Sequence, residues 1–215
     1  MSSECQPYEI IEQGMNDSCG AVRAETINLL YNKYVPLEMI EYWLMDDDEN
    51  VRAAVLHICR DRDVPLKLIE RGFKDESEYV HSAAFIACKG RDIPLTIIES
   101  WLENDYWIVR AAAMEVCKGK IVPLELIKRG LNDVDWFVRS TAIQVCLNEY
   151  VPIEFIECAL RSENKNNQYK AKTVCEIRNI PSEVIKRWLD DDNLCVRETA
   201  MKLSNRKENN GEAKT

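Results

Sequence analysis

Seven prolines divide the sequence at equal intervals, and this regularity constrains the fold more than any other feature. They lie at positions 7, 36, 65, 94, 123, 152 and 181, each 29 residues after the last. A fixed period of this length is typical of repeat proteins, in which each period forms one supersecondary unit that stacks on its neighbours. The spacing therefore excludes a single irregular globular domain, a doubly wound sheet and a catalytic barrel.

Each 29-residue period predicts two helices joined by a turn. We number positions from the proline, so that +12 lies twelve residues after it. Proline suits the first turn of a helix because its missing N–H has no partner there, and the apolar residues at +1, +4 and +8 have helical spacing. Position +12 holds Asp, Ser or Asn in five of the seven periods, which indicates the N-cap of a second helix from about +13 to +24.

Helices of this length are marginal on their own in water, so each hairpin must bury its apolar face against its neighbours. The sequence therefore predicts an all-α fold, a right-handed α-solenoid (superhelix) of seven two-helix repeats that forms a single domain over residues 1–206. Residues 207–215 have almost no apolar side chains, and we expect them to form a disordered polar tail.

We call the residues at one position of all seven periods a column. The pattern of these columns resembles that of the HEAT-like helical repeats, here with short units of 29 residues. The resemblance rests on the proline of the first helix, an aspartate in the turn, and a Val-Arg pair whose arginine lies six residues beyond that aspartate. It implies a helical-repeat fold and a binding habit but does not imply any reaction, and it implies that these side chains form a ladder of hydrogen-bonded ion pairs between successive turns. The matching pairs are Asp17/Arg23, Asp46/Arg52, Asp133/Arg139 and Asp191/Arg197.

Nine cysteines raise the question of redox or metal chemistry. Stacked helices lie about 8–10 Å apart, whereas a disulfide requires Cα atoms within about 7 Å. Cysteines that share one column are therefore predicted to act as small buried side chains and not to form disulfides. No Cys-x-x-Cys pair occurs, and we expect neither a metal site nor a cofactor. Free thiols, together with N-terminal residues that lack an apolar export signal, predict a cytoplasmic location. The five cysteines that share column +23 are Cys59, Cys88, Cys117, Cys146 and Cys175.

No constellation of side chains indicates catalysis, and we predict that the protein is not an enzyme. HEAT-like metallohydroxylases carry repeated His-Glu dipeptides for iron, whereas His57 is followed by Ile and His81 by Ser. The acidic runs at 46–49 and 190–192 are contiguous, whereas calcium loops alternate their ligands around a glycine turn. Both runs precede a predicted helix, where carboxylates interact favourably with the helix dipole.

Position +7 alternates between small and large side chains. One interpretation is packing between neighbouring units in the layer of first helices, and the other is an exposed binding stripe. Regular alternation favours packing. The residues at this position are Gly14, Trp43, Gly72, Trp101, Gly130, Ala159 and Trp188.

The fourth and fifth periods depart from the others at the start of the second helix. Trp107 and Trp136 stand where the second and third periods hold glutamate, and Tyr106 precedes the first indole. We expect small residues at +17, such as Ser140, to lie on the same surface and leave the indoles uncovered. Grouped aromatics of this kind indicate either an interface hot spot or a locally enlarged core.

The sixth period departs from the repeat in a different way, because Ser162 and Gln168 replace the aspartate and the arginine together. Residues 161–178 carry a local charge of +3 in a chain of net charge −9, and Tyr169 replaces the small residue at +17. This pattern indicates either a weakened, flexible unit or the rim of a basic, aromatic pocket. The candidate partner-binding residues are Tyr106, Trp107, Trp136, Ser140, Gln144, Lys165 and Tyr169.

The function predicted from these features is a scaffold or adaptor that binds a protein or peptide on its second helices, with a monomer favoured. A pI of about 4.9 argues against binding to nucleic acid, and no apolar stretch is long enough to span a membrane. One alternative is an acidic inhibitor that blocks a basic, nucleic-acid-binding surface of its partner. Another is a HEAT-like DNA glycosylase with Trp107, Trp136 and Asp133 around an extruded base.

Overall fold

The computed structural model describes residues 6–148 and 150–212. Those residues form fourteen α-helices and no strand, which confirms the all-α prediction. The first helices of the predicted hairpins are α1 (Gln6–Met15), α3 (Leu37–Trp43), α5 (Leu66–Gly72), α7 (Leu95–Leu102), α9 (Leu124–Leu131), α11 (Ile153–Leu160) and α13 (Ser182–Leu189). The second helices are α2 (Gly20–Asn28), α4 (Glu49–Cys59), α6 (Glu78–Cys88), α8 (Trp107–Val116), α10 (Trp136–Val145), α12 (Lys165–Ile177) and α14 (Leu194–Glu212). Each first helix packs against the second helix that follows it.

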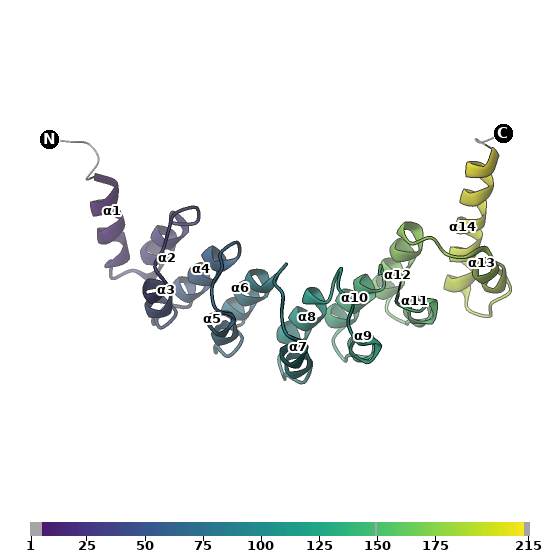
Figure 1. Cartoon of the computed structure of the whole chain (residues 1–215), viewed down its shortest axis with the longest axis horizontal. Helices are drawn as coiled ribbons and strands as arrows, with labels where there is room; N and C mark the ends of the chain where they lie inside the picture. The colour runs from purple at the N-terminus through teal and green to yellow at the C-terminus, as the bar shows by residue number, and fades with distance from the viewer. Residues whose placement is uncertain (1–5, 149, 213–215) are drawn as a thin grey trace. The chain divides into compact units, whose positions relative to one another are not determined.

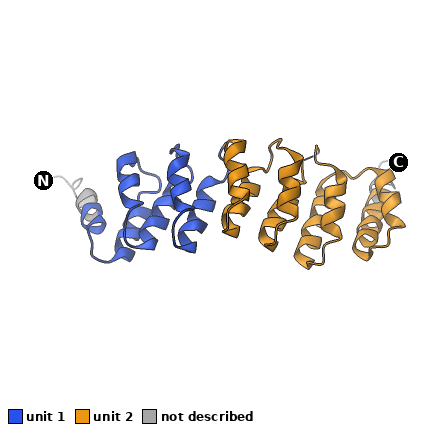
Figure 2. Ribbon diagram, turned by 90° about the horizontal axis from the view of Figure 1, so that it is seen from below, with its two compact units in different colours: residues 1–91 blue, residues 92–215 orange. Residues whose placement is uncertain are grey.

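The chain divides into two compact units, Met1–Arg91 and Asp92–Thr215 (Figure 2), whereas the sequence predicted one domain over residues 1–206. Within the N-terminal unit α4 packs between α2 and α6, and within the C-terminal unit α10 packs between α8 and α12. In each unit the first helices form a separate layer beside the second helices (Figure 1). Among the residues that the structure describes, no helix is long and apolar enough to cross a membrane.

The helix boundaries follow the proline and N-cap columns. From the second period onward each proline is itself an N-cap, with ψ between 132° and 146°, and the first helix begins at the next residue. Five second helices begin behind a side chain that accepts a backbone N–H of their first turn, as the sequence predicted. These caps are Asp48, Ser77, Asp135, Asn164 and Asn193.

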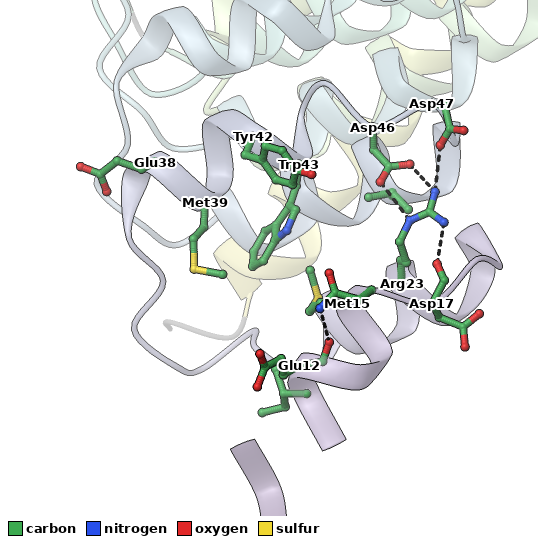
Figure 3. Close-up of a pocket in the computed structure, with 13 residues that line it drawn as sticks. Glu12, Met15, Asp17, Arg23, Glu38, Met39, Tyr42, Trp43, Asp46 and Asp47 are labelled. Carbon is green, nitrogen blue, oxygen red and sulfur yellow. Dashed lines mark hydrogen bonds and ion pairs between the residues drawn. The ribbon is translucent and has the colours of Figure 1, made fainter. Parts of the chain in front are cut away.

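Arginine–aspartate rungs join neighbouring hairpins within each unit. In the three complete rungs, Nε and Nη2 of the guanidinium bind both oxygens of an aspartate 23 residues later, at 2.6 to 3.0 Å. Nη1 donates to two backbone carbonyls of the arginine's own turn at 2.8 to 3.2 Å. Figure 3 shows this arrangement for Arg23, Asp46 and the carbonyl of Asp17. The complete rungs are Arg23–Asp46, Arg52–Asp75 and Arg110–Asp133.

The rungs differ from the predicted pairs in the identity of the carboxylate. The sequence paired residues of one period, such as Asp46 with Arg52, but Arg52 reaches only the main-chain carbonyl of Asp46, at 2.8 Å. Its carboxylate partner, Asp75, belongs to the next hairpin. The other three predicted pairs are wrong in the same way, because each arginine donates to the carbonyl of its predicted aspartate at 2.6 to 2.9 Å. These contacts are Arg23 to Asp17, Arg139 to Asp133 and Arg197 to Asp191.

The last predicted pair shows the difference most clearly. Arg197 Nη1 donates to the carbonyl of Asp191 at 2.6 Å, whereas the carboxylate of Asp191 binds Arg161, with Nη2 and Oδ2 2.5 Å apart. Arg197 therefore fixes the turn before α14 through a main-chain contact, and the predicted ion pair between Asp191 and Arg197 does not form. The reason is geometric. Nη1 of the guanidinium faces the main chain of its own turn, whereas the edge formed by Nε and Nη2, which binds carboxylates in the complete rungs, faces away from that turn.

In the third and fourth periods two positions of the rung columns hold other residue types. The arginine column holds His81, and the aspartate column 23 residues later holds Asn104. The ring of His81 keeps one contact of the arginine column, because its Nε2 lies 2.6 Å from the carbonyl of Asp75.

A second set of contacts, which the sequence comparison missed, ties down the C-terminal ends of the second helices. Arg62 donates to the carbonyls of Leu30, Tyr31 and Lys33 at 2.6 to 2.8 Å, and Arg91 donates to the carbonyl of Cys59 at 2.7 Å. Helix C-termini leave carbonyls without intrahelical partners and favour a nearby cation. Column +26 is basic in six of the seven periods, so the signal is present in the sequence.

The same column explains why the predicted tail is not disordered throughout. Helix α14 continues to Glu212, so the prediction is wrong for residues 207–212, while residues 213–215 lie outside the described residues. Arg206 donates to the carbonyl of Glu176 at 3.1 Å, and Lys207 donates to that of Ile180 at 2.8 Å. A prediction from composition cannot detect these hydrogen bonds of Arg206 and Lys207 with carbonyls of the preceding hairpin.

The cysteine column lies in the core, as predicted. Cys59, Cys88, Cys117 and Cys146 are buried and form no disulfide among the described residues, and Cys5 lies outside those residues. Burial raises the pKa of Cys59 and Cys117 to about 11 and that of Cys146 to about 12. Thiols held in this form are poor nucleophiles, so the column acts as packing.

The tryptophans at +7 are core residues, which excludes an exposed stripe, but the glycines at this position pack on second helices and not, as predicted, on neighbouring first helices. Trp43, Trp101 and Trp188 are buried. At Gly72 an added Cβ would lie 2.5 Å from Leu56 of the preceding hairpin and 2.9 Å from Ala84 of its own. The close neighbours are therefore side chains of the second helices, and not those of the adjacent first helix.

We predict that Arg52→Ala lowers the free energy of unfolding by about 3 kcal/mol, because it leaves a largely buried carboxylate without its partner. The side chains of Arg52 and Asp75 are only 11% and 12% exposed. Urea unfolding measures the effect. Lys67→Ala, which breaks the exposed Lys67–Glu41 pair of the same unit, is the control and should change the free energy by less than about 1 kcal/mol. Equal effects of the two substitutions would contradict a structural role for the rung.

We also predict a loss of stability in acid. Burial alone would raise the pKa of the Asp75 carboxyl, but hydrogen bonds from Arg52 and from the N–H of Ser77 hold that pKa below its ordinary value. Since the folded pKa is the lower one, the contribution is complete above the unfolded pKa of about 4 and is lost as pH falls through the folded pKa. Urea midpoints measured against pH should therefore fall in this window, and fall less steeply in Asp75→Asn than in the wild type.

Candidate functional site

An exposed aromatic cluster lies where α8 and α10 begin. Trp107 is 38% exposed and Trp136 is 47% exposed. The ring of Phe137 contacts both indoles edge-on, with centroid distances of 5.4 Å to Trp107 and 5.6 Å to Trp136. We call Tyr106, Trp107, Trp136 and Phe137 the aromatic edge. Its indoles are surface residues, so the alternative of a locally enlarged core does not hold for them.

Local hydrogen bonds position the aromatic edge. Asp135 caps α10 by accepting from the N–H groups of Phe137 at 2.7 Å and Val138 at 3.4 Å. The N–H of Tyr106 donates to Asn104 Oδ1 at 2.9 Å, which fixes the entry into α8. The Arg110–Asp133 rung joins α8 to the turn before α10, so the spacing between the two indoles is set by a bidentate ion pair.

The small residues at +17 do not lie on the surface as predicted. Ser140 is only 6% exposed and Ala111 is fully buried, because this column faces the adjacent second helix and lets α8 and α10 approach closely. Gln144, by contrast, is partly exposed. Ser140 is therefore a buried packing residue, which does not fit its prediction as a partner-binding residue.

The sixth hairpin forms a pocket instead of a tight contact. Tyr169, the large residue at +17, is 68% exposed and lines a cavity of about 360 Å³ between α12 and α14. Lys165 and Leu194, the first residues of these helices, line the same cavity. Column +17 holds small residues in the first five periods but Tyr169 in the sixth and Glu198 in the seventh, and both of these large side chains line the cavity.

The sequence left two interpretations of the sixth period, a weakened unit or the rim of a basic, aromatic pocket. One observation supports each of them. Asn167 replaces an apolar residue and is buried, and its Oδ1 has no hydrogen-bond partner among the described residues, which weakens the unit. Lys165 is exposed and forms no ion pair within the described parts of the chain. The rim of the cavity is thus basic and aromatic, although the unit beneath it carries a local defect.

The carboxylates that sequence patterns singled out have structural partners. Asp133, the candidate base of the glycosylase alternative, is held at 2.7 and 2.9 Å by Arg110. In the run at 46–49, Asp46 and Asp47 bind Arg23 and Asp48 caps α4. Among the described residues no three His, Cys, Asp or Glu side chains gather in an arrangement that could hold a metal ion.

A larger cleft, of about 790 Å³, lies in the N-terminal unit (Figure 3). Met39 and Tyr42 of α3 form one wall, and Met15 of α1 and the Arg23–Asp46 rung contribute to the other. Both Tyr42 and Met39 are exposed. The cleft lies beside the first helix of the chain and shares its polar residues with the structural rung.

Comparisons with models of protein families and with curated proteins found no match to this chain. The assignment of a function therefore depends on the geometry of its surface.

We predict that Trp107 and Trp136 dominate the quenching of tryptophan fluorescence. The other three tryptophans are buried, so acrylamide should reach only these two. Acrylamide is preferable to iodide because a neutral quencher is not repelled by a chain of net charge −9. In Trp107→Ala/Trp136→Ala the quenchable fraction should nearly disappear while far-UV circular dichroism is retained. A quenchable fraction equal to that of the wild type would show that the indoles are covered in solution.

Proposed function

We propose that this protein is a non-enzymatic interaction scaffold that binds a protein or peptide at the aromatic edge. The observation that carries the proposal is the exposure of Trp107 and Trp136 on either side of Phe137. We further propose that the hairpins of both units belong to one HEAT-like, right-handed solenoid of seven repeats. Its free thiols fit a reducing compartment such as the cytoplasm.

The aromatic edge has the properties of an interface anchor. Tryptophan is enriched among the residues that dominate binding energy, and an indole offers a large apolar surface with a polar N–H. Phe137 and the cap at Asp135 hold the rings in place before a partner arrives, so less side-chain entropy is lost on binding. A patch of this kind on a monomer's surface indicates a contact with another molecule.

The charge of the next second helix, α12, favours a partner with acidic groups. Lys165 and Lys170 form no ion pair among the described residues, whereas Lys172 binds Glu198 at 3.1 Å. These cations follow the aromatic edge along the next second helix, in a chain whose net charge is −9. Complementary charge at the rim of an interface governs specificity and the association rate more than affinity.

We predict that Trp107→Ala/Trp136→Ala abolishes binding to partners captured from an extract of the native host. Truncation of a hot-spot aromatic typically weakens binding by about 2 kcal/mol or more, or roughly 30-fold per residue. The measurement is the dissociation constant of each captured protein, produced separately, for the wild type and the variant.

A matched control distinguishes this surface from general adhesion of exposed aromatics. Tyr34 and Tyr42 are the most exposed tyrosines of the N-terminal unit, so Tyr34→Ala/Tyr42→Ala removes two aromatic rings elsewhere. This control should bind like the wild type. If the tryptophan variant binds every partner with unchanged affinity while its fold is intact, the proposal is wrong.

A further inference from the structure

Arg139 of the C-terminal unit is half of a rung. Like the arginines of the complete rungs, it donates from Nη1 to two carbonyls of its own turn, those of Asp133 at 2.7 Å and Val134 at 2.8 Å. The position 23 residues later holds Ser162 instead of aspartate. Ser162 Oγ accepts from Asn164 N and Asn167 Nδ2. Within the described residues, Nε and Nη2 of Arg139 have no carboxylate partner.

On the C-terminal side of the sixth hairpin, the aspartate that lost its arginine binds a different arginine. Gln168 stands where the next arginine would be, and Asp191 is the aspartate that such an arginine would bind. Asp191 instead binds Arg161, as described above. Gln168 Nε2 still donates to the carbonyl of Ser162 at 2.7 Å. The two charged residues that lost a partner are Arg139 and Asp191. Among the described residues, Asp191 binds Arg161, whereas the Nε–Nη2 edge of Arg139 binds no carboxylate.

This open edge lies beside the aromatic edge. Arg139 is three residues after Trp136 on α10, a spacing that places two side chains on the same face of a helix. Arg139 is partly exposed. The nearest carboxylate in sequence after the missing aspartate, Glu163, is exposed and forms no ion pair with it. The exposed amine of Lys165 adds a second positive charge at the start of α12.

We propose that the Nε–Nη2 edge of Arg139 is a carboxylate-binding site that receives an aspartate or glutamate side chain of the partner. The proposal rests on the function proposed above, and it names the chemistry that the partner must present beside the apolar groups that contact Trp136. An acidic side chain is the expected ligand because aspartate fills this edge in all three complete rungs. The bound carboxylate would accept two parallel hydrogen bonds, a geometry in which arginine is specific.

Two substitutions in the full chain test the site. Ser162→Asp supplies the missing carboxylate from within, as in the Arg110–Asp133 rung, and should raise stability to urea while it blocks the site. Arg139→Gln removes the charged edge but can keep a carbonyl bond, as Gln168 does. The matched control is Asn166→Asp, which adds the same charge at an exposed position of α12 outside the rung.

The first probe is sodium acetate, followed by NMR of the arginine Nε–Hε signals, with sodium chloride at equal ionic strength as the reference. In the wild type and in Asn166→Asp, acetate should shift the signal of Arg139 in a saturable way and leave that of Arg110 unchanged. In Ser162→Asp the Arg139 signal should no longer respond. If acetate shifts the signal no more than chloride does, or if Ser162→Asp leaves the response intact, the site is not a carboxylate site.

The second probe is a displayed library of random peptides with amidated C-termini, selected on the wild-type protein. Selected peptides should be enriched in Asp or Glu beside apolar residues, and each should bind Ser162→Asp and Arg139→Gln about tenfold or more weakly, as expected when a charge-assisted pair is removed. If no peptides are selected, or those selected lack this enrichment, the inferred role of Arg139 is wrong.

The two proposals fail in distinguishable ways. Trp107→Ala/Trp136→Ala should abolish peptide binding but leave the acetate response of Arg139 unchanged, because the indoles do not form the carboxylate site. Peptides that lose affinity in the tryptophan variant and bind Ser162→Asp within about twofold of the wild type would support the scaffold and overturn the role of Arg139. Peptides that depend on Arg139 alone would overturn the aromatic edge as the anchor.

Discussion

The arginine–aspartate rung is the interaction on which the rest of each unit depends. One guanidinium satisfies two carbonyls at the end of its own turn and both oxygens of a carboxylate in the next hairpin, so it links hydrogen-bonding groups that would otherwise be left at a helix terminus. Each helix is too short to be stable alone, so its stability depends on apolar burial against its neighbours and on the shared polar contact that fixes one hairpin on the next. Because the pair is partly buried and fully hydrogen-bonded, breaking it removes more than an exposed ion pair would.

The two ends of the second helices use opposite charges. Carboxylates lie at the N-terminal ends, in rungs and caps, whereas the cations of column +26 bind carbonyls at the C-terminal ends. Both arrangements follow the helix dipole, and between them the cysteine column and small residues fill the space between adjacent second helices. Few columns remain free to vary, and the first residue of the second helix is one of them. The aromatic edge therefore lies at a position where large side chains do not disturb the stacking.

The sequence predicted the helices and the buried columns well, because these depend on local spacing and on the apolar or polar character of each position. The sequence could not assign the aspartate whose carboxylate binds Arg52. An aspartate six residues before an arginine and one 23 residues after it occupy the same column when the period is 29, so periodicity defines the two columns that interact but not which neighbouring hairpin supplies each member. The same ambiguity placed Ser140 on the surface, since helical spacing does not show which face meets the adjacent helix. The helical residues 207–212 were missed because their anchor, Lys207, binds a carbonyl of a distant turn.

The broken rung shows why departures from a repeat carry information about function. If Ser162 and Gln168 were lost partners of one pair, as the sequence implied, their joint replacement would leave no charge behind. The structure places them in two different rungs, so the replacement leaves Arg139 and Asp191, and among the described residues Asp191 binds another arginine whereas Arg139 has no carboxylate partner. An aspartate at 162 would complete the rung at Arg139 by one substitution, as the neighbouring rung at Arg110 shows. The absence of that aspartate, beside exposed indoles and a Lys165 that forms no ion pair among the described residues, is a feature that stacking does not require, and it fits the acidic partner proposed above.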